Sequence, residues 1–268
     1  MHVIKRAAAL VVGVSFALVI YAQSSRAQFD VASVKRNING TDSDFEVAPG
    51  GRLVATNRTV TDLIFHAYNL RPYQIPDKPD WAHSEHYDIQ AKAAGNLSWA
   101  EMMPMLQSLL ENRFQLKSHW ETKELPVFFI SAAKGGIKLK PSTAHCIRFD
   151  TGAPARTVAE AQTSQPICKV GQVSGGGGEK RRWIAENASI NDVTYVLSNL
   201  LGRKVIDKTE FTGRFDFDLE FSSDPLKTDA TVPPLITVMQ EELGLRVESG
   251  NGPVEIFVID QIEHPAEN

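Results

Sequence analysis

Two histidines, His83 and His86, flank Glu85 in a proline-rich segment, and two imidazoles at this spacing could hold a metal ion. A third ligand is not evident nearby, and the chain contains no HExxH motif. The alternative interpretation of this segment is an exposed polar loop, which has the same composition. His119 and Glu121, on one face of a predicted strand, have the same two interpretations. The sequence therefore predicts no metal site and no cofactor.

The residue types that carry out hydrolysis lack suitable surroundings in this sequence. A serine nucleophile needs a strained elbow or an SxxK element, and neither is present. Asp88 and Asp150 have no credible acidic partner for paired-carboxylate hydrolysis, and the glycine run 175–178 lacks the Gly-Lys-Ser/Thr end of a phosphate loop. We therefore expect no catalytic residues, and a hydrolase that uses the His83 and His86 region is the alternative.

The segment 71–87 is the strongest candidate for a binding site. It places aromatic side chains between prolines, and such loops bind well because rings offer a large contact area while prolines limit the entropy that is lost. The candidate ligand-binding residues are Arg71, Tyr73, Trp81, His83, Glu85 and His86. The alternative is that Tyr73 and Trp81 fold back to cover the core.

The first 27 residues have the pattern of a secretory signal peptide. Lys5 and Arg6 precede an apolar run at 7–20, and Ala27 ends a small-residue cleavage site. The run has 14 residues, fewer than the roughly 20 that span a bilayer, and a retained anchor is the alternative. We expect a mature chain that begins near Gln28, lies in the periplasm or outside the cell, and has no membrane span.

Cleavage at this site would remove three basic residues and no acidic ones. The formal net charge would then change from −4 to −7, with 25 basic against 32 acidic residues. Binding to nucleic-acid phosphates requires a concentrated basic face, so we expect no nucleic-acid partner.

Only two cysteines occur, Cys146 and Cys168, and both lie in the segment 134–180, which is rich in Gly, Ser, Thr and Pro. Export brings cysteine thiols into an oxidising environment, so we predict a disulfide between Cys146 and Cys168, with two free thiols as the alternative. The segment shows neither helical nor strand periodicity. It is therefore predicted to be an insertion that is flexible apart from its disulfide.

The same order of elements occurs twice, about 130 residues apart. The motif AxNxTVxDL at 55–63 is repeated as AxNxSIxDV at 185–193, and both contain a capping pattern at the start of a predicted helix. The first copy predicts strands at 52–56, 73–75, 87–93, 115–123 and 127–132 and helices at 59–70 and 98–113. The second predicts strands at 182–186, 204–207, 214–221, 245–248 and 254–262 and helices at 189–201 and 233–243.

We therefore expect an α+β protein with two tandem β-α-β-β-α-β-β copies, whose helices pack on mostly antiparallel sheets. Asn251-Gly252 is predicted to form a hairpin turn in the second copy. The expected division is a signal peptide (1–27), a first copy with N-terminal strands (28–133), the insertion (134–180) and a second copy (181–268).

Several segments resemble a family of secreted, soil-associated bacterial proteins of unknown function. They are FDVASVK at 29–35, YDIxAK at 87–92, ETKELPV at 121–127 and the ending VIDxIExPxEN at 258–268. The resemblance covers nearly the whole mature chain and implies export without implying an activity. Some relatives carry this domain beside a membrane metallopeptidase of the antibiotic-sensor type, which suggests sensing outside the cytoplasm. Each copy also resembles the short N-terminal module of secretins and TonB-dependent receptors.

The sequence as a whole favours an exported, non-catalytic binding or interaction module. The expected partner is an envelope protein, a peptide or a glycan. A hydrolase of unrecognised type, or a structural protein whose sheet edges pair with other chains, are the alternatives.

Overall fold

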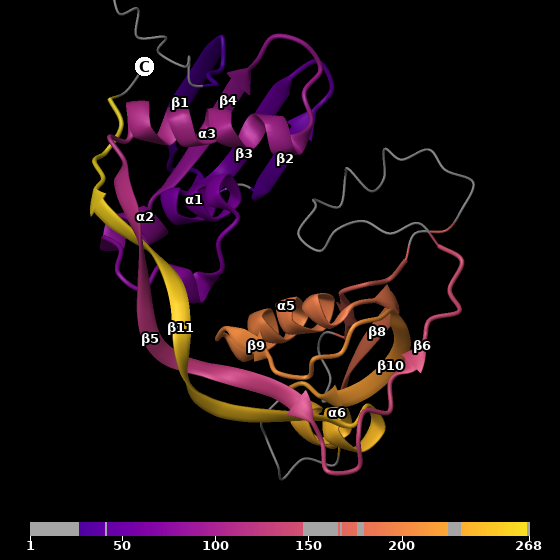
Figure 1. The fold of residues 1–268 in the computed structure, drawn as a ribbon. Coiled ribbons are helices and arrows are strands. Elements are labelled where there is room, and N and C mark those ends of the chain that lie inside the picture. The colour runs from indigo at the N-terminus through magenta and orange to yellow at the C-terminus, as the bar shows by residue number, and fades with distance from the viewer. Residues whose placement is uncertain are drawn as a thin grey trace, which may run out of the picture.

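A computed structural model of the protein describes residues 27–40, 42–146, 166, 168–175, 180–224 and 232–266. The predicted signal peptide lies outside these residues, except for Ala27. Helices and mostly antiparallel strands form two helix-on-sheet units that are joined by a long pair of strands (Figure 1). The predicted α+β class is therefore confirmed. In the part of the chain that the structure describes, every helix is too short or too polar to cross a bilayer.

The first unit combines a four-stranded sheet with three helices. Its strands β1 (Val31–Asn37), β2 (Asp44–Ala48), β3 (Arg52–Thr59) and β4 (His86–Lys92) follow the order β1-β4-β3-β2, and its helices are α1 (Val60–Tyr68), α2 (Asp80–Ser84) and α3 (Trp99–Arg113). The helices α1 and α3 each have an apolar face and pack together. Leu63 of α1 and Leu106 of α3 are fully buried in one core with Tyr87 of β4.

The second unit has the same strand order. Its strands β6 (Lys140–Pro141), β7 (Gln172–Ser174), β8 (Lys180–Ala188) and β10 (Phe215–Ser222) follow the order β6-β10-β8-β7, and its helices are α5 (Ile190–Leu201) and α6 (Leu235–Glu242). In each unit the first strand therefore pairs with the fourth, and the third lies between the fourth and the second. Trp183, Phe215 and Leu235 are fully buried in the core of this unit.

The segment 134–180 is not wholly the irregular insertion that the sequence predicts. Its ends form β6 and β7, which pair with β10 and β8 and belong to the second sheet. Strands of two and three residues are too short to produce a periodic pattern, so the sequence does not reveal them. The predicted disulfide is confirmed: Cys146 and Cys168 are bonded and close the connection between β6 and β7.

The first helix of each unit begins at a capping box. The side chain of Thr59 accepts a hydrogen bond from the backbone of Asp62, and the carboxylate of Asp62 accepts one from the backbone of Thr59. Ser189 and Asp192 make the same two hydrogen bonds at the start of α5. These side chains satisfy backbone N–H groups that a helix start leaves without partners, and they fix where α1 and α5 begin.

Two long strands connect the units. β5 (Lys117–Ala132) leaves the first unit, β11 (Leu245–Gln261) returns from the second, and they pair antiparallel along nearly their whole lengths (Figure 1). β9 (Val205–Asp207) joins the end of β5 in parallel. Phe128 and Ile130 of β5 are buried in the core of the second unit, and Phe257 of β11 is buried in that of the first. The two units therefore exchange strands.

The sequence predicts two short strands at the position of β5 and two at that of β11. The strand residues are confirmed, but the predicted break within each pair is wrong. Residues 245–261 form one strand, and Asn251 and Gly252 lie within it and pair with β5. A type I′ hairpin turn needs positive φ at both of these residues, and neither has it. Pairing with β5 outweighs the local turn preference, and a Cβ at Gly252 would lie only 3.0 Å from Ile206 Cδ1.

The strand predicted at 73–75 is also wrong, because this segment contains the 3₁₀ helix η1 (Pro72–Gln74). Pro72 fixes its own φ in the helical range and lacks an N–H group, which suits the first position of a helical turn. Pro76 follows at once, so no room is left for a strand ladder. Instead, Gln74 reaches β11 through its side chain, and its Nε2 donates to the carbonyl of Glu255 at 3.1 Å.

Candidate functional site

The predicted binding loop, residues 71–87, contacts both units. Tyr73 packs beside Val127 and Val254 of the connecting strands, and its hydroxyl lies close to the side chain of Ser198 on α5. Burial raises the pKa of Tyr73, so the hydroxyl stays protonated at neutral pH. Tyr73 therefore attaches the loop to the second unit.

The following part of the loop contacts the C-terminal segment. Trp81 stacks on His264 with ring centroids 4.1 Å apart, and His264 Nε2 lies 3.3 Å from a carboxylate oxygen of Glu85. Glu85 also pairs with Arg36 at 3.0 Å and accepts a hydrogen bond from Tyr87. Burial, together with Glu85, raises the pKa of Tyr87 to about 12. The structure thus brings Trp81 and Glu85 together, with partners from both ends of the chain.

The histidines of the loop lie at different places. His83 is exposed on α2, and His86 is half-buried at the start of β4. His119 lies on the connecting strands, 2.9 Å from Asp260 and 3.1 Å from Glu121. Among all the residues with a described position, no group of three His, Cys, Asp or Glu side chains could hold a metal ion.

A cavity of about 330 Å³ lies where α1 of the first unit approaches α5 of the second. Its size is at the lower end of the range for small-molecule sites, roughly 300–1,000 Å³. This inter-unit cavity is lined by Asp62, Phe65, His66, Asn69, Leu70, Arg71, Trp99 and Tyr195. Phe65 and Tyr195 each lie six residues after the cap residue of their helix, so equivalent positions of the two helices meet here.

Aromatic rings form much of the wall of the inter-unit cavity. Phe65, His66, Trp99 and Tyr195 are all half-exposed. Behind them, Phe45 of β2 stacks on His66 with ring centroids 4.2 Å apart and contacts Trp99 edge-on at 5.1 Å. The rings of His66 and Trp99 therefore have fixed orientations, which favours a preformed apolar surface for a ligand.

The charged groups of the inter-unit cavity lie on α1 and just after it. The Arg71 guanidinium lies 4.0 Å from the centre of the Tyr195 ring, and its Nη1 donates to the carbonyl of Leu70 at 3.5 Å. Asp62 also lines the cavity, but its carboxylate caps α1. Burial, and then the charge of Arg58, lower the pKa of His66 against the opposing effect of Asp62. His66 is therefore neutral at pH 7, with one ring nitrogen that donates and one that accepts.

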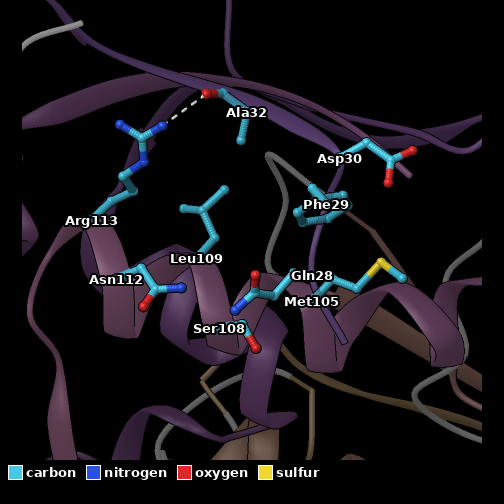
Figure 2. Close-up of a pocket in the computed structure, with 9 residues that line it drawn as sticks. All are labelled: Gln28, Phe29, Asp30, Ala32, Met105, Ser108, Leu109, Asn112 and Arg113. Atoms are coloured by element: carbon cyan, nitrogen blue, oxygen red, sulfur yellow. Dashed lines mark hydrogen bonds between the residues drawn. The ribbon is translucent and has the colours of Figure 1, made fainter. Parts of the chain in front are cut away.

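A second cavity of about 160 Å³ lies between the N-terminal segment and α3 (Figure 2). It is lined by Gln28, Phe29, Asp30, Ala32, Met105, Ser108, Leu109, Asn112 and Arg113. Figure 2 shows Arg113 beside Ala32, whose carbonyl accepts a hydrogen bond from Arg113 Nη2 at 3.2 Å. This cavity has less than half the volume of the other, and the contact attaches β1 to α3. We therefore take the inter-unit cavity as the candidate functional site.

Of the six residues predicted for the binding site, Arg71 alone lines the inter-unit cavity. Tyr73, Trp81, Glu85 and the two histidines lie elsewhere in the loop. The sequence did not identify Phe65 and Tyr195, because both lie beside the apolar stripe of their helix and neither belongs to it. A signal was present nonetheless, since an aromatic residue occurs at the same position of both copies.

Comparison with known proteins gives a family but no characterised relative. No curated protein and no solved structure matches this chain. A family model matches residues 61–262, which include all of α1 except its first residue, the predicted loop, α5 and both connecting strands. The chain therefore belongs to the family described as Protein of unknown function (DUF3738).

Proposed function

We propose that this protein is an exported binding module that takes up a small ligand in the inter-unit cavity and has no catalytic role of its own. The observation that carries the proposal is the cavity of about 330 Å³ at the junction of the two units, with four half-exposed rings in its wall. Ligand sites often lie at such junctions, because side chains from two bodies can surround a ligand there.

The choice of binding over catalysis rests on the chemistry of the lining residues. Asp62 is engaged as a helix cap, and His66 stacks on Phe45. Catalysis by hydrolysis needs a nucleophile held by a base, or an activated water, within hydrogen-bond distance. Rings and one guanidinium instead suit recognition, because they offer contact area and a charge without a reactive group.

Export is supported by the pattern of residues 1–27 and by the disulfide, which forms most readily outside the cytoplasm. The protein is proposed to act in the periplasm or outside the cell, as its resemblance to secreted soil-associated proteins implies. Mass spectrometry of the protein from its own cells should find an amino terminus near Gln28. A soluble form that retains Met1 would refute export.

The proposal also treats the two units as copies of one ancestral unit. The shared strand order, the two capping boxes and the equivalent positions of Phe65 and Tyr195 support this view. A cavity between copies then arises from the duplication, because equivalent helices face each other across the junction.

The fluorescence of Trp99 provides a test of the site. The chain has four tryptophans, and Trp99 is the one that lines the inter-unit cavity. A library of small polar and aromatic compounds is screened against the mature chain by thermal shift, since a ligand that binds only the folded state raises Tm. Compounds that raise Tm should also change the tryptophan emission.

Two matched variants locate the binding. Trp99→Phe keeps a ring in the cavity wall and should abolish the change in emission, while the rise in Tm persists. Trp120→Phe removes an exposed indole on β5, outside the cavity lining, and should leave the change intact. If no compound raises Tm, or if the change in emission persists in Trp99→Phe, the proposed site is wrong.

A further inference from the structure

Building on the proposed function, we infer that the ligand of the inter-unit cavity is a small aromatic carboxylate. Its carboxylate pairs with the Arg71 guanidinium and its ring lies against Phe65, Trp99 and Tyr195. The inference rests on three observations: the partners of Arg71, the balance of charge around the cavity, and the shape of its wall.

Most N–H donors of Arg71 have no acceptor among the residues that the structure describes. Arg71 is half-buried, and its guanidinium rests on the Tyr195 ring at 4.0 Å and gives one hydrogen bond, at 3.5 Å, to the carbonyl of Leu70. No carboxylate with a described position pairs with this guanidinium. A guanidinium presents five N–H donors in a planar fork that fits a carboxylate with two parallel hydrogen bonds. The contact with the Tyr195 ring holds the guanidinium in place in advance, so less entropy is lost on binding.

The charges around the cavity favour an anion. Arg71 lines it, and Arg58 is close enough to act on His66, while Asp62 is the one acidic residue among the described residues that line the cavity. The carboxylate of Asp62 lies at the start of α1, where the helix N-terminus offsets part of its charge, and Arg71 lies beyond the C-terminal end, where its charge opposes the partial negative charge of the helix. His66 is neutral at pH 7 and adds no charge. The full charge nearest to this end of the cavity is therefore the positive charge of Arg71.

The charge of Asp62 makes the site favour a carboxylate ligand over a phosphate ligand. A phosphate monoester carries nearly two negative charges at neutral pH, and Asp62 repels it more strongly than it repels a carboxylate with one charge. A single guanidinium compensates one charge fully and two only in part. The site therefore favours a monoanion.

The walls and the volume define the rest of the ligand. Phe65, Trp99 and Tyr195 come from α1, α3 and α5, so rings approach the cavity from three helices. Flat apolar faces of this kind pack well against another ring, in stacked or edge-on contact. A cavity of about 330 Å³ accommodates a ring with a short side chain better than an extended polymer.

Four probes that share one ring test the charge requirement. Calorimetric titrations use phenylacetate, phenylacetamide, phenethylamine and phenyl phosphate against the mature chain. We expect phenylacetate to bind at least tenfold more tightly than the amide and the phosphate, and the amine to bind most weakly. A charge-assisted pair of hydrogen bonds is the source of this difference.

The role of Arg71 is tested with Arg71→Gln and with Arg203→Gln as a matched control. Arg203 also lies over a ring, that of Phe128, but it is not part of the cavity lining. Arg71→Gln should weaken phenylacetate binding about 10- to 100-fold and change amide binding less than about threefold. Arg203→Gln should leave both affinities unchanged. The ratio of the two affinities is informative even if Arg71→Gln lowers stability, because both ligands are measured on the same variant.

The outcomes separate this inference from the proposed function. If the amide binds as tightly as the carboxylate, or if Arg71→Gln weakens both equally, the ligand class is wrong while the cavity remains a binding site. If none of the four probes binds at millimolar concentration, the ligand class is also wrong. The library screen then decides independently whether the cavity binds any small molecule.

Discussion

At the residue scale, the same contact fixes the backbone just before each unit's first helix. Asn57 and Asn187 both adopt a left-handed conformation, with φ of 52° and 51°. The N–H group of Asn57 donates to Asp88 at 2.8 Å, and that of Asn187 donates to Asp216 at 2.7 Å. Asparagine tolerates this conformation better than most residues, and the carboxylates satisfy N–H groups that the irregular strand leaves without a ladder partner.

The hydrogen bonds of Asp216 predict an acid-dependent loss of stability. Burial raises the pKa of this carboxyl, but the side chain of Ser142 and the neighbouring backbone N–H groups outweigh burial, and the pKa is lowered. The N–H groups of Asn187 and Thr143 donate to the carboxylate at 2.7 and 2.9 Å. A carboxyl with a lowered pKa stabilises the fold above its unfolded pKa, and this stabilisation is lost as pH falls through the folded pKa. Asp216→Asn should therefore cost about 1–2 kcal/mol at pH 7, and this cost should shrink as pH falls through the folded pKa of Asp216.

Urea unfolding of the two proteins between pH 2 and pH 7 measures this difference. Glu220→Gln is the control, because Glu220 lies on the same strand with its side chain exposed and 3.8 Å from Lys180. It should change stability by less than about 0.5 kcal/mol. If the difference in free energy of unfolding between the wild type and Asp216→Asn does not depend on pH, the carboxylate charge does not stabilise the fold.

At the element scale, the exchanged strands decide how the units depend on each other. Phe257 is 1 % exposed within the first unit's core and contacts Tyr68 at 4.5 Å between ring centroids, although it comes from the last strand of the chain. Phe128 is buried in the second unit's core although it precedes that unit in sequence. Each half of the chain therefore contributes a buried ring to the other half's core.

Two substitutions test this exchange. Phe257→Ala and Phe128→Ala should each cost about 3–5 kcal/mol, since both remove a buried ring. Hydrogen exchange should show the loss of protection in the unit whose core holds the ring. Phe257→Ala is expected to open α1 and β4 of the first unit, and Phe128→Ala to open α5 and β8 of the second. Phe129→Ala, at a half-buried neighbouring position, should cost less. Loss of protection in α5 and β8 from Phe257→Ala would contradict the exchange.

The disulfide gives a prediction for the second sheet. It links residues 22 apart in sequence and closes the connection between β6 and β7, and the Cys168 side chain is buried in the second unit's core. Reduction should lower the free energy of unfolding by about 3 kcal/mol, because the unfolded chain gains entropy. Thermal unfolding with and without reductant measures the loss. The double variant Cys146→Ala and Cys168→Ala should no longer respond to reductant.

The elements that the sequence predicts well are those fixed by local signals. The helices predicted at 98–113 and 189–201 match α3 and α5 to within one residue, because apolar periodicity and capping residues both lie within the helix and its first turn. The long strands were predicted as pieces, because their pairing joins residues more than 100 positions apart. A local turn signal such as Asn251-Gly252 cannot reveal that a distant strand lies beside it.

At the scale of the whole molecule, the candidate site exists only because the units meet. Arg71 belongs to the loop that the sequence singled out for its aromatic content, but its ring partner, Tyr195, lies more than 120 residues away. Composition and spacing identify a loop suited to binding, and they do not state which surface it faces. The inter-unit cavity therefore follows from the exchanged strands and from the contact of Tyr73 with Ser198, both of which bring α5 close to α1.

The most direct test of the account is hydrogen exchange with and without saturating phenylacetate. Added protection is expected in three separated segments, residues 62–71 around α1, the first turn of α3 around Trp99, and residues 191–199 around Tyr195, because a ligand in the inter-unit cavity contacts both units at once. The segments around Trp81 and His264 should not change. Protection confined to one unit, or centred on Trp81 and His264, would contradict a binding site between the units.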